Sequence, residues 1–126
     1  MDVISVFIQN RPGRLSQILK EVMSLKLYGF SIADAGEFGV VRLCLEDPHK
    51  AVDKLKRHDL IAHVTPAIAI EDNKLMDVIE IFERRNINID EAIYAVNRDD
   101  RSLVVLKVSD TQRASSLLEE EGIETF

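Results

Sequence analysis

Apolar residues recur along the chain with two spacings, one typical of helices and one typical of strands. Four of them follow the i, i+3, i+4, i+7 spacing of a helix that buries one face. They are Leu15, Ile18, Leu19 and Val22. Before them, Ile4, Val6 and Ile8 occupy every second position, the spacing of a strand that buries one side. The pattern therefore predicts a strand followed by a helix near the start of the chain.

The same pattern occurs a second time, about 60 residues further along the chain. The helical spacing returns at Leu75, Val78, Ile79 and Phe82. Alternating apolar positions at Val41, Leu43 and Leu45 have counterparts 63 residues later, at Val104, Leu106 and Val108. The offset between the copies changes only where loops are expected, as insertions in a duplicated fold require. The chain is therefore predicted to contain one module twice.

Each copy is predicted to fold as strand, helix, strand, strand, helix, strand. In the first copy, strands are expected at 4–8, 30–35, 40–46 and 61–65, with helices at 14–25 and 48–58. In the second, strands are expected at 67–71, 89–96, 103–109 and 123–125, with helices at 74–85 and 111–121. Asp47 is expected to cap a helix, and Gly122 to end one in the left-handed conformation. The predicted fold class is α+β: two βαββαβ ferredoxin-like units, 1–66 and 67–126, with helices on one face of each antiparallel sheet.

Composition and charge exclude several classes of protein. The 126 residues are 46% hydrophobic, which is typical of a globular chain, and no apolar run approaches the length of about 20 residues that spans a membrane. The N-terminus lacks the basic and apolar segments of a signal peptide, so a cytoplasmic protein without membrane contact is expected. A net charge of −6 argues against a nucleic-acid partner.

No catalytic or metal-binding constellation stands out. The single cysteine, Cys44, excludes an internal disulfide and a multi-cysteine metal site, and is interpreted as a small buried hydrophobe. The three histidines lack metal-ligand spacing. Ser16 and Ser31 have no recognisable base and orienting acid for a triad. We therefore predict no catalytic residue, no metal and no cofactor, and expect that the protein is not an enzyme.

The segment Asn10–Leu15, between the first strand and the first helix, is the most informative candidate site. A glycine at a helix N-terminus leaves backbone N–H groups free to point outward, and the helix dipole favours an anion there. Arg11 and Arg14 add positive charge of a kind that matches a carboxylate. A plain tight turn is an equally good interpretation of the loop alone. The second copy has Asp72–Leu75 instead, without glycine, where Asp72 or Asn73 can cap the helix and close the site.

The sheet faces turned away from the helices carry apolar residues as well. Phe7, Val40, Cys44 and Val105 lie on that side of their strands. We expect this face to be covered by the other unit or by a second chain, and a homodimer is predicted. A half-exposed antiparallel sheet is the alternative.

Several of these segments resemble ACT domains, small regulatory modules that bind amino acids. The resemblance rests on the repeat, on the loop Asn10–Leu15, on Asn86–Ile89, and on Ser31–Asp34 followed by Glu37–Leu43. The last stretch is similar to stand-alone proteins made of two ACT domains. In such proteins the ligand sits between the first loop of one unit and the second strand of its neighbour. The resemblance thus implies these ligand-binding residues: Asn10, Arg11, Pro12, Gly13, Arg14, Leu15, Ser31, Ile32, Ala33, Asp34 and Phe38.

The chain departs from the ACT pattern in its first loop. ACT loops usually carry an aspartate just before the Pro-Gly pair, where Asn10 and Arg11 stand here. Asp34 or Glu37 is then a candidate to hold a ligand's amine, unless both are solvated hairpin charges.

Three classes of function follow. The first is a non-catalytic sensor that binds a free amino acid and changes its own assembly or the activity of an unidentified regulated enzyme. The second is a ligand-free structural or oligomerisation module. The third, which the loss of the loop in the second copy disfavours, is an acylphosphatase-like enzyme whose arginine loop holds a phosphoryl group.

Overall fold

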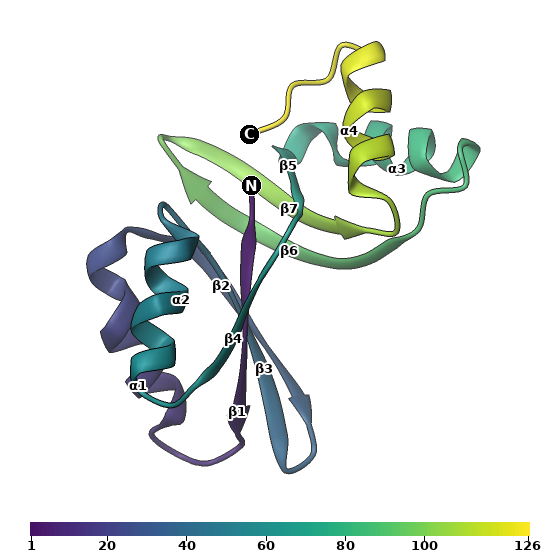
Figure 1. Ribbon diagram of the computed structural model, residues 1–126. Helices are drawn as coiled ribbons and strands as arrows, with labels where there is room; N and C mark the ends of the chain where they lie inside the picture. The colour runs from purple at the N-terminus through teal and green to yellow at the C-terminus, as the bar shows by residue number, and fades with distance from the viewer. The chain divides into compact units, whose positions relative to one another are not determined.

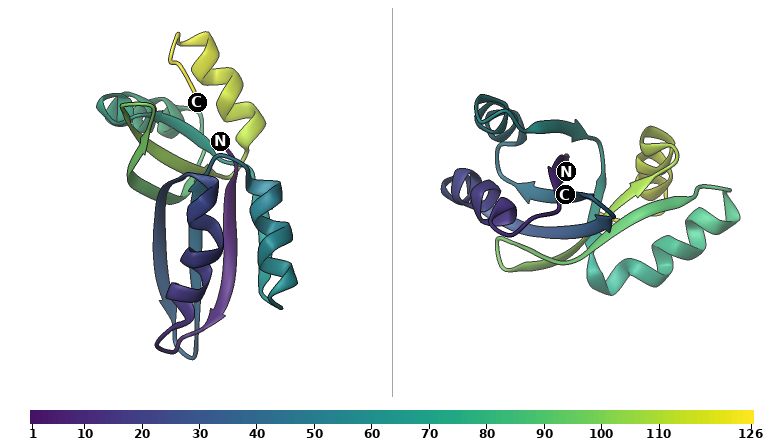
Figure 2. Two further views of the ribbon diagram at one scale, coloured as in Figure 1. Left: turned by 90° about the vertical axis from the view of Figure 1, so that its left-hand side faces the viewer. Right: turned by 90° about the horizontal axis from the view of Figure 1, so that it is seen from below.

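The chain forms two compact units in the computed structural model, which describes residues 1–126. The first unit is Asp2–Thr65; the second is Pro66–Phe126 together with Met1. In each unit two helices cover one face of an antiparallel sheet, as Figure 1 and Figure 2 show. None of the helices combines the length and the apolar composition that a membrane span requires. The predicted α+β fold class is confirmed.

The first unit has a four-stranded sheet in the order β2-β3-β1-β4, in which neighbouring strands are antiparallel. Its strands are β1 (Val3–Gln9), β2 (Leu27–Ala35), β3 (Phe38–Leu45) and β4 (Ile61–Thr65). Its helices are α1 (Arg14–Val22), extended by a 3₁₀ turn over Met23–Leu25, and α2 (Pro48–Arg57). The core lies between the sheet and the helices, where Val6, Ile18 and Leu55 are fully buried. The apolar residues of the strands and those of the helices thus pack together in one layer, as predicted.

The second unit has a three-stranded sheet in the order β5-β7-β6. Its strands are β5 (Ile68–Glu71), β6 (Ile89–Arg98) and β7 (Arg101–Val108). Its helices are α3 (Leu75–Arg84), which follows a 3₁₀ turn over Asp72–Lys74, and α4 (Thr111–Glu120). Phe82 is the largest fully buried side chain and packs in the core with Ile70, Leu106 and Leu118.

The strand predicted at 123–125 is absent, and the end of α4 explains why. Gly122 has φ +71°, so the expected left-handed terminator is confirmed. The N–H of Gly122 bonds to the carbonyl of Glu119 (3.1 Å), and that of Ile123 to the carbonyl of Leu118 (2.9 Å). This pair of bonds is a Schellman motif, in which the backbone N–H of Ile123 belongs to the end of α4. Only Phe126 then reaches β5, through one backbone bond to Ala69 (3.0 Å).

Helices α2 and α4 begin in the same way in the two units. Asp47 accepts a hydrogen bond from the N–H of Lys50 (3.1 Å), and Asp110 accepts one from that of Arg113 (3.1 Å). Both aspartates therefore cap their helices, α2 and α4.

Strand β2 begins three residues earlier than predicted. Lys26 adopts φ +58°, a left-handed conformation that ends the preceding turn and lets the strand start at Leu27. Asn86 has the same φ at the corresponding place in the second unit. Strand β3 also begins early, at Phe38, because a two-residue turn at Gly36–Glu37 closes the β2–β3 hairpin.

The sheet face opposite the helices is buried at some positions and exposed at others. Cys44 and Val105 are 0% and 2% exposed, whereas Phe7 is 43% exposed. Burial raises the pKa of the Cys44 thiol from 9.0 to about 12, so this thiol stays protonated at neutral pH. Cys44 is thus a small buried hydrophobe, as the sequence indicates.

Candidate functional site

The loop between β1 and α1 turns on a glycine in a left-handed conformation. Gly13 has φ +91°, which residues with a Cβ rarely adopt, although a Cβ there would meet no atom within 4 Å. The N–H of Arg14 bonds back to the carbonyl of Arg11 at 3.3 Å, which closes the turn. Gly13 is therefore required for its backbone conformation and not for lack of space.

The N-terminus of α1 is open. No side chain caps it, and its first turn holds no acidic residue. The first hydrogen bond of the helix runs from the N–H of Gln17 to the carbonyl of Gly13 (3.1 Å), so the N–H groups of Leu15 and Ser16 have no partner within the helix. The partial positive charge of this end, together with nearby arginines, favours a bound anion.

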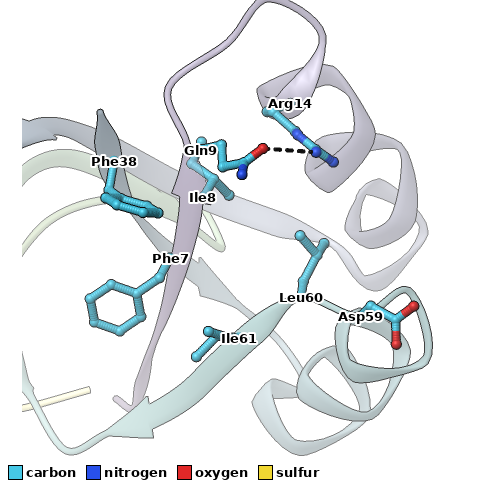
Figure 3. Close-up of a pocket in the computed structure, with 8 residues that line it drawn as sticks. All are labelled: Phe7, Ile8, Gln9, Arg14, Phe38, Asp59, Leu60 and Ile61. Atoms are coloured by element: carbon cyan, nitrogen blue, oxygen red, sulfur yellow. Dashed lines mark hydrogen bonds between the residues drawn. The ribbon is translucent and has the colours of Figure 1, made fainter. Parts of the chain in front are cut away.

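The Arg14 side chain is held in place by two neutral amide groups. Its guanidinium donates to Oε1 of Gln17 at 3.2 Å and to Oε1 of Gln9 at 3.3 Å, the second bond being drawn in Figure 3. Neither partner carries a charge, so the positive charge of Arg14 is positioned without being neutralised. A guanidinium in this state can pair with a carboxylate.

Asn10 ties the loop to the β2–β3 hairpin. Its side-chain amide donates to Oδ1 of Asp34 (3.0 Å) and to the carbonyl of Gly36 (3.3 Å). Its backbone N–H donates to the carbonyl of Glu37 at 2.9 Å. The same Oδ1 of Asp34 also accepts from the N–H of Gly36 (3.0 Å). Asn10 and Asp34 thus hold the loop and the hairpin together.

Three hollows surround this loop. An open hollow of about 450 Å³ lies before α1, lined by Arg11, Pro12, Gly13, Arg14 and Gln17. A second, of about 300 Å³, is lined by Gln9, Asn10, Arg11, Glu37 and Phe38. The third, of about 330 Å³, lies between the ends of β1 and β4 and is drawn in Figure 3. Arg14 lines both the first and the third hollow.

The residues implied by the resemblance do not all lie around these hollows. Asn10 to Arg14 form the loop, Asp34 touches it, and Phe38 lines two hollows. Ser31, Ile32 and Ala33 lie on the edge strand β2, which β3 separates from β1. The side chain of Leu15 packs against the core of the first unit.

Other residues of the site had not been identified in the sequence. Gln9 and Gln17 orient Arg14, and Asp59, Leu60 and Ile61 line the third hollow. Gln9 directly precedes the loop motif, and this position is the one feature of the sequence that could have identified Gln9. Asp59, Leu60 and Ile61 carry no such signal, because they lie more than 40 residues away in the chain. No group of three or more His, Cys, Asp or Glu side chains is placed to hold a metal ion.

The corresponding end of α3 differs from the prediction. Neither Asp72 nor Asn73 caps the helix with its side chain. A 3₁₀ turn over these residues leads directly into α3, and the N–H of Leu75 bonds to the carbonyl of Asp72. The backbone itself thus takes over the role that a capping side chain was expected to play.

A family model described as an ACT domain pair matches residues 1–125. The chain belongs to the ACT domain pair family. The sequence resemblance to tandem ACT domains is thereby confirmed over nearly the whole chain. The two antiparallel sheets with their four helices are accordingly those of an ACT domain pair.

Solved structures share the fold of this ACT domain pair. Protein BT0572 from Bacteroides thetaiotaomicron is 21% identical with a TM-score of 0.86, covering 99% of this chain and 90% of that one. The ligand-free regulatory subunit of aspartate kinase from Thermus thermophilus is 10% identical, with a TM-score of 0.64 and coverages of 94% and 91%. A structure of aspartokinase alpha and beta subunits is 13% identical, with a TM-score of 0.54 and coverages of 94% and 90%. A search of curated proteins finds no match.

Proposed function

We propose that the protein is a non-catalytic regulatory protein that binds a free amino acid at the loop between β1 and α1. The observation that carries the proposal is the open N-terminus of α1 beside the unneutralised guanidinium of Arg14. Membership of the ACT domain pair family supports it. The fold shared with a regulatory subunit of aspartate kinase is consistent with a regulatory role.

The positive charge around the N-terminus of α1 suits an α-carboxylate. The free N–H groups at the start of α1 and the side chains of Arg11 and Arg14 all favour negative charge. Binding regulates only when the ligand has different affinities for two states of the protein or of its complex. We therefore expect the response to appear in the assembly of this chain or in an enzyme that it contacts.

Thermal denaturation in the presence of each of the twenty amino acids tests the proposal. A ligand that binds only the folded state at 100 times its Kd adds about 2.7 kcal/mol to the free energy of unfolding, which raises Tm by several degrees. We expect at least one amino acid to raise Tm, and the Arg14→Gln variant to reduce that shift. Arg84→Gln, an exposed arginine on α3, is the control.

No shift with any amino acid, in a chain that unfolds cooperatively, would contradict the proposal. The protein would then be better described as a ligand-free structural module.

We also propose that the protein forms a homodimer through the first unit. Strand β2 is a nine-residue edge strand without a second neighbour, and its residues Phe30 and Ile32 are 43% and 52% exposed. Long apolar edge strands tend to pair with another chain. Sedimentation velocity at micromolar concentration should give the mass of a dimer, and Phe30→Lys should shift the distribution toward monomer. A monomer across the concentration range would contradict this.

A further inference from the structure

Strand β6 contains one residue more than the strand that it pairs with. β6 forms an edge of the second sheet, beside β7, as Figure 1 shows. Eight residues of β6 (91–98) lie opposite seven residues of β7 (101–107). The extra residue follows Ile93, where Tyr94 and Ala95 together oppose a single residue of β7. This arrangement of two residues against one is a β-bulge.

Ala95 adopts a left-handed backbone conformation in this bulge. Its φ is +60°, which glycine adopts readily and which is unfavourable for a residue with a Cβ. The side-chain amide of Asn97 donates to the carbonyl of Ala95 at 3.4 Å, so this carbonyl has a partner within its own strand. An unfavourable backbone conformation inside a regular element suggests that the bulge has a function.

The corresponding strand of the first unit lacks the extra residue. Residues 29–35 of β2 lie opposite residues 38–44 of β3, seven against seven, without a shift of register. When β2 and β6 are matched through the strands beside them, the counterpart of Ala95 would fall between Ile32 and Ala33. The two copies of the module therefore differ by one residue in their edge strands.

The bulge changes how well β6 could pair with another chain. An added strand needs backbone N–H and C=O groups that are regularly spaced along the edge. β2 is in unbroken register over seven residues, 29–35, whereas β6 is in register for only three at a time, 91–93 and 96–98. β6 is thus the poorer edge for a second copy, although its ten residues make it the longest strand of the chain.

The two remaining sheet edges are short. β4 has five residues and β5 has four, and short edge strands are one way in which proteins avoid unwanted pairing. Phe126 also occupies part of the β5 edge, through its backbone bond to Ala69 (3.0 Å). Among the four edges, β2 alone combines length with an unbroken register.

We propose that the bulge at Tyr94 and Ala95 closes the β6 edge to a second copy of the chain, so that assembly ends at a dimer. The inference rests on the homodimer through β2 that is proposed above. Such a dimer has two β6 edges, one from each copy. If these edges were open, further copies could add to them and the assembly would have no fixed end. The bulge prevents this growth.

Deletion of Ala95 tests the proposal. The deletion leaves Tyr94 alone opposite its residue of β7 and restores one-to-one pairing along β6. In sedimentation velocity over a series of rising concentrations, the parent should reach the mass of a dimer and stay there. The deletion variant should form larger species whose mass grows with concentration. Ala95→Gly is the control: it keeps the bulge and relieves the backbone strain, so it should melt no lower than the parent and remain a dimer.

A reciprocal variant places the bulge in β2. Inserting one glycine between Ile32 and Ala33 adds a residue at the position that corresponds to Ala95. This variant should sediment as a monomer while its circular dichroism spectrum remains that of the parent. It also decides the question if the chain without Ala95 does not fold.

The outcomes separate this inference from the proposed homodimer. A parent that forms assemblies larger than a dimer would overturn the inference, and so would a folded deletion variant that remains a dimer. A folded insertion variant that still dimerises would overturn it as well. If the parent is a monomer and the deletion variant associates, the bulge closes β6 but the proposed dimer through β2 is wrong. If neither of them associates, both proposals are wrong.

Discussion

Replacing Phe82 by alanine should lower the free energy of unfolding by about 3–5 kcal/mol, the range for removing a buried aromatic ring. Phe82 lies on helix α3, is 1% exposed and packs in the core of the second unit. The second unit has only three strands, so few other side chains can move in to fill the cavity. Urea denaturation followed by circular dichroism measures the loss.

Met76 supplies the control for this experiment. It lies on the same helix and is 63% exposed. Met76→Ala should therefore change stability by no more than about 0.5 kcal/mol. Equal effects of the two substitutions would mean that Phe82 does not anchor the core.

The parts of the fold that could be predicted depend on local sequence. Helical spacing, strand alternation and capping residues each involve positions close together in the chain, and each acts in the same way in both copies. Asp47 therefore caps α2 as expected, and Asp110 caps α4 at the matching place in the second unit. The loop with Gly13 was recognisable for the same reason.

The parts that could not be predicted depend on competition or on tertiary contact. Residues 123–125 have the composition of a strand, but the helix-end bonds of Ile123 take precedence. At the start of α3, a backbone turn replaces the expected side-chain cap. Asp59 joins the site only because the end of α2 and the start of α1 lie at the same end of the sheet, as Figure 2 shows.

Replacing Gly13 by aspartate should abolish the amino-acid response of the protein. The new carboxylate would lie at the N-terminus of α1 and occupy the positive environment proposed for the ligand. We expect at least about a 100-fold loss of affinity, because the ligand loses a charge-assisted contact and gains a repulsion. Titration calorimetry measures this loss. The left-handed backbone at φ +91° adds a stability cost of roughly 1–2 kcal/mol.

Two further variants separate the charge from the backbone strain. Gly122→Asp introduces the same side chain at another left-handed glycine, with φ +71° and no atom within 4 Å of the new Cβ. It should lower Tm by a similar amount and leave binding intact. Gly13→Ala imposes the strain without the charge and should keep most of the affinity. If Gly13→Ala abolishes binding as completely as Gly13→Asp, the backbone conformation of the loop governs recognition, and the proposed anion site at α1 is wrong.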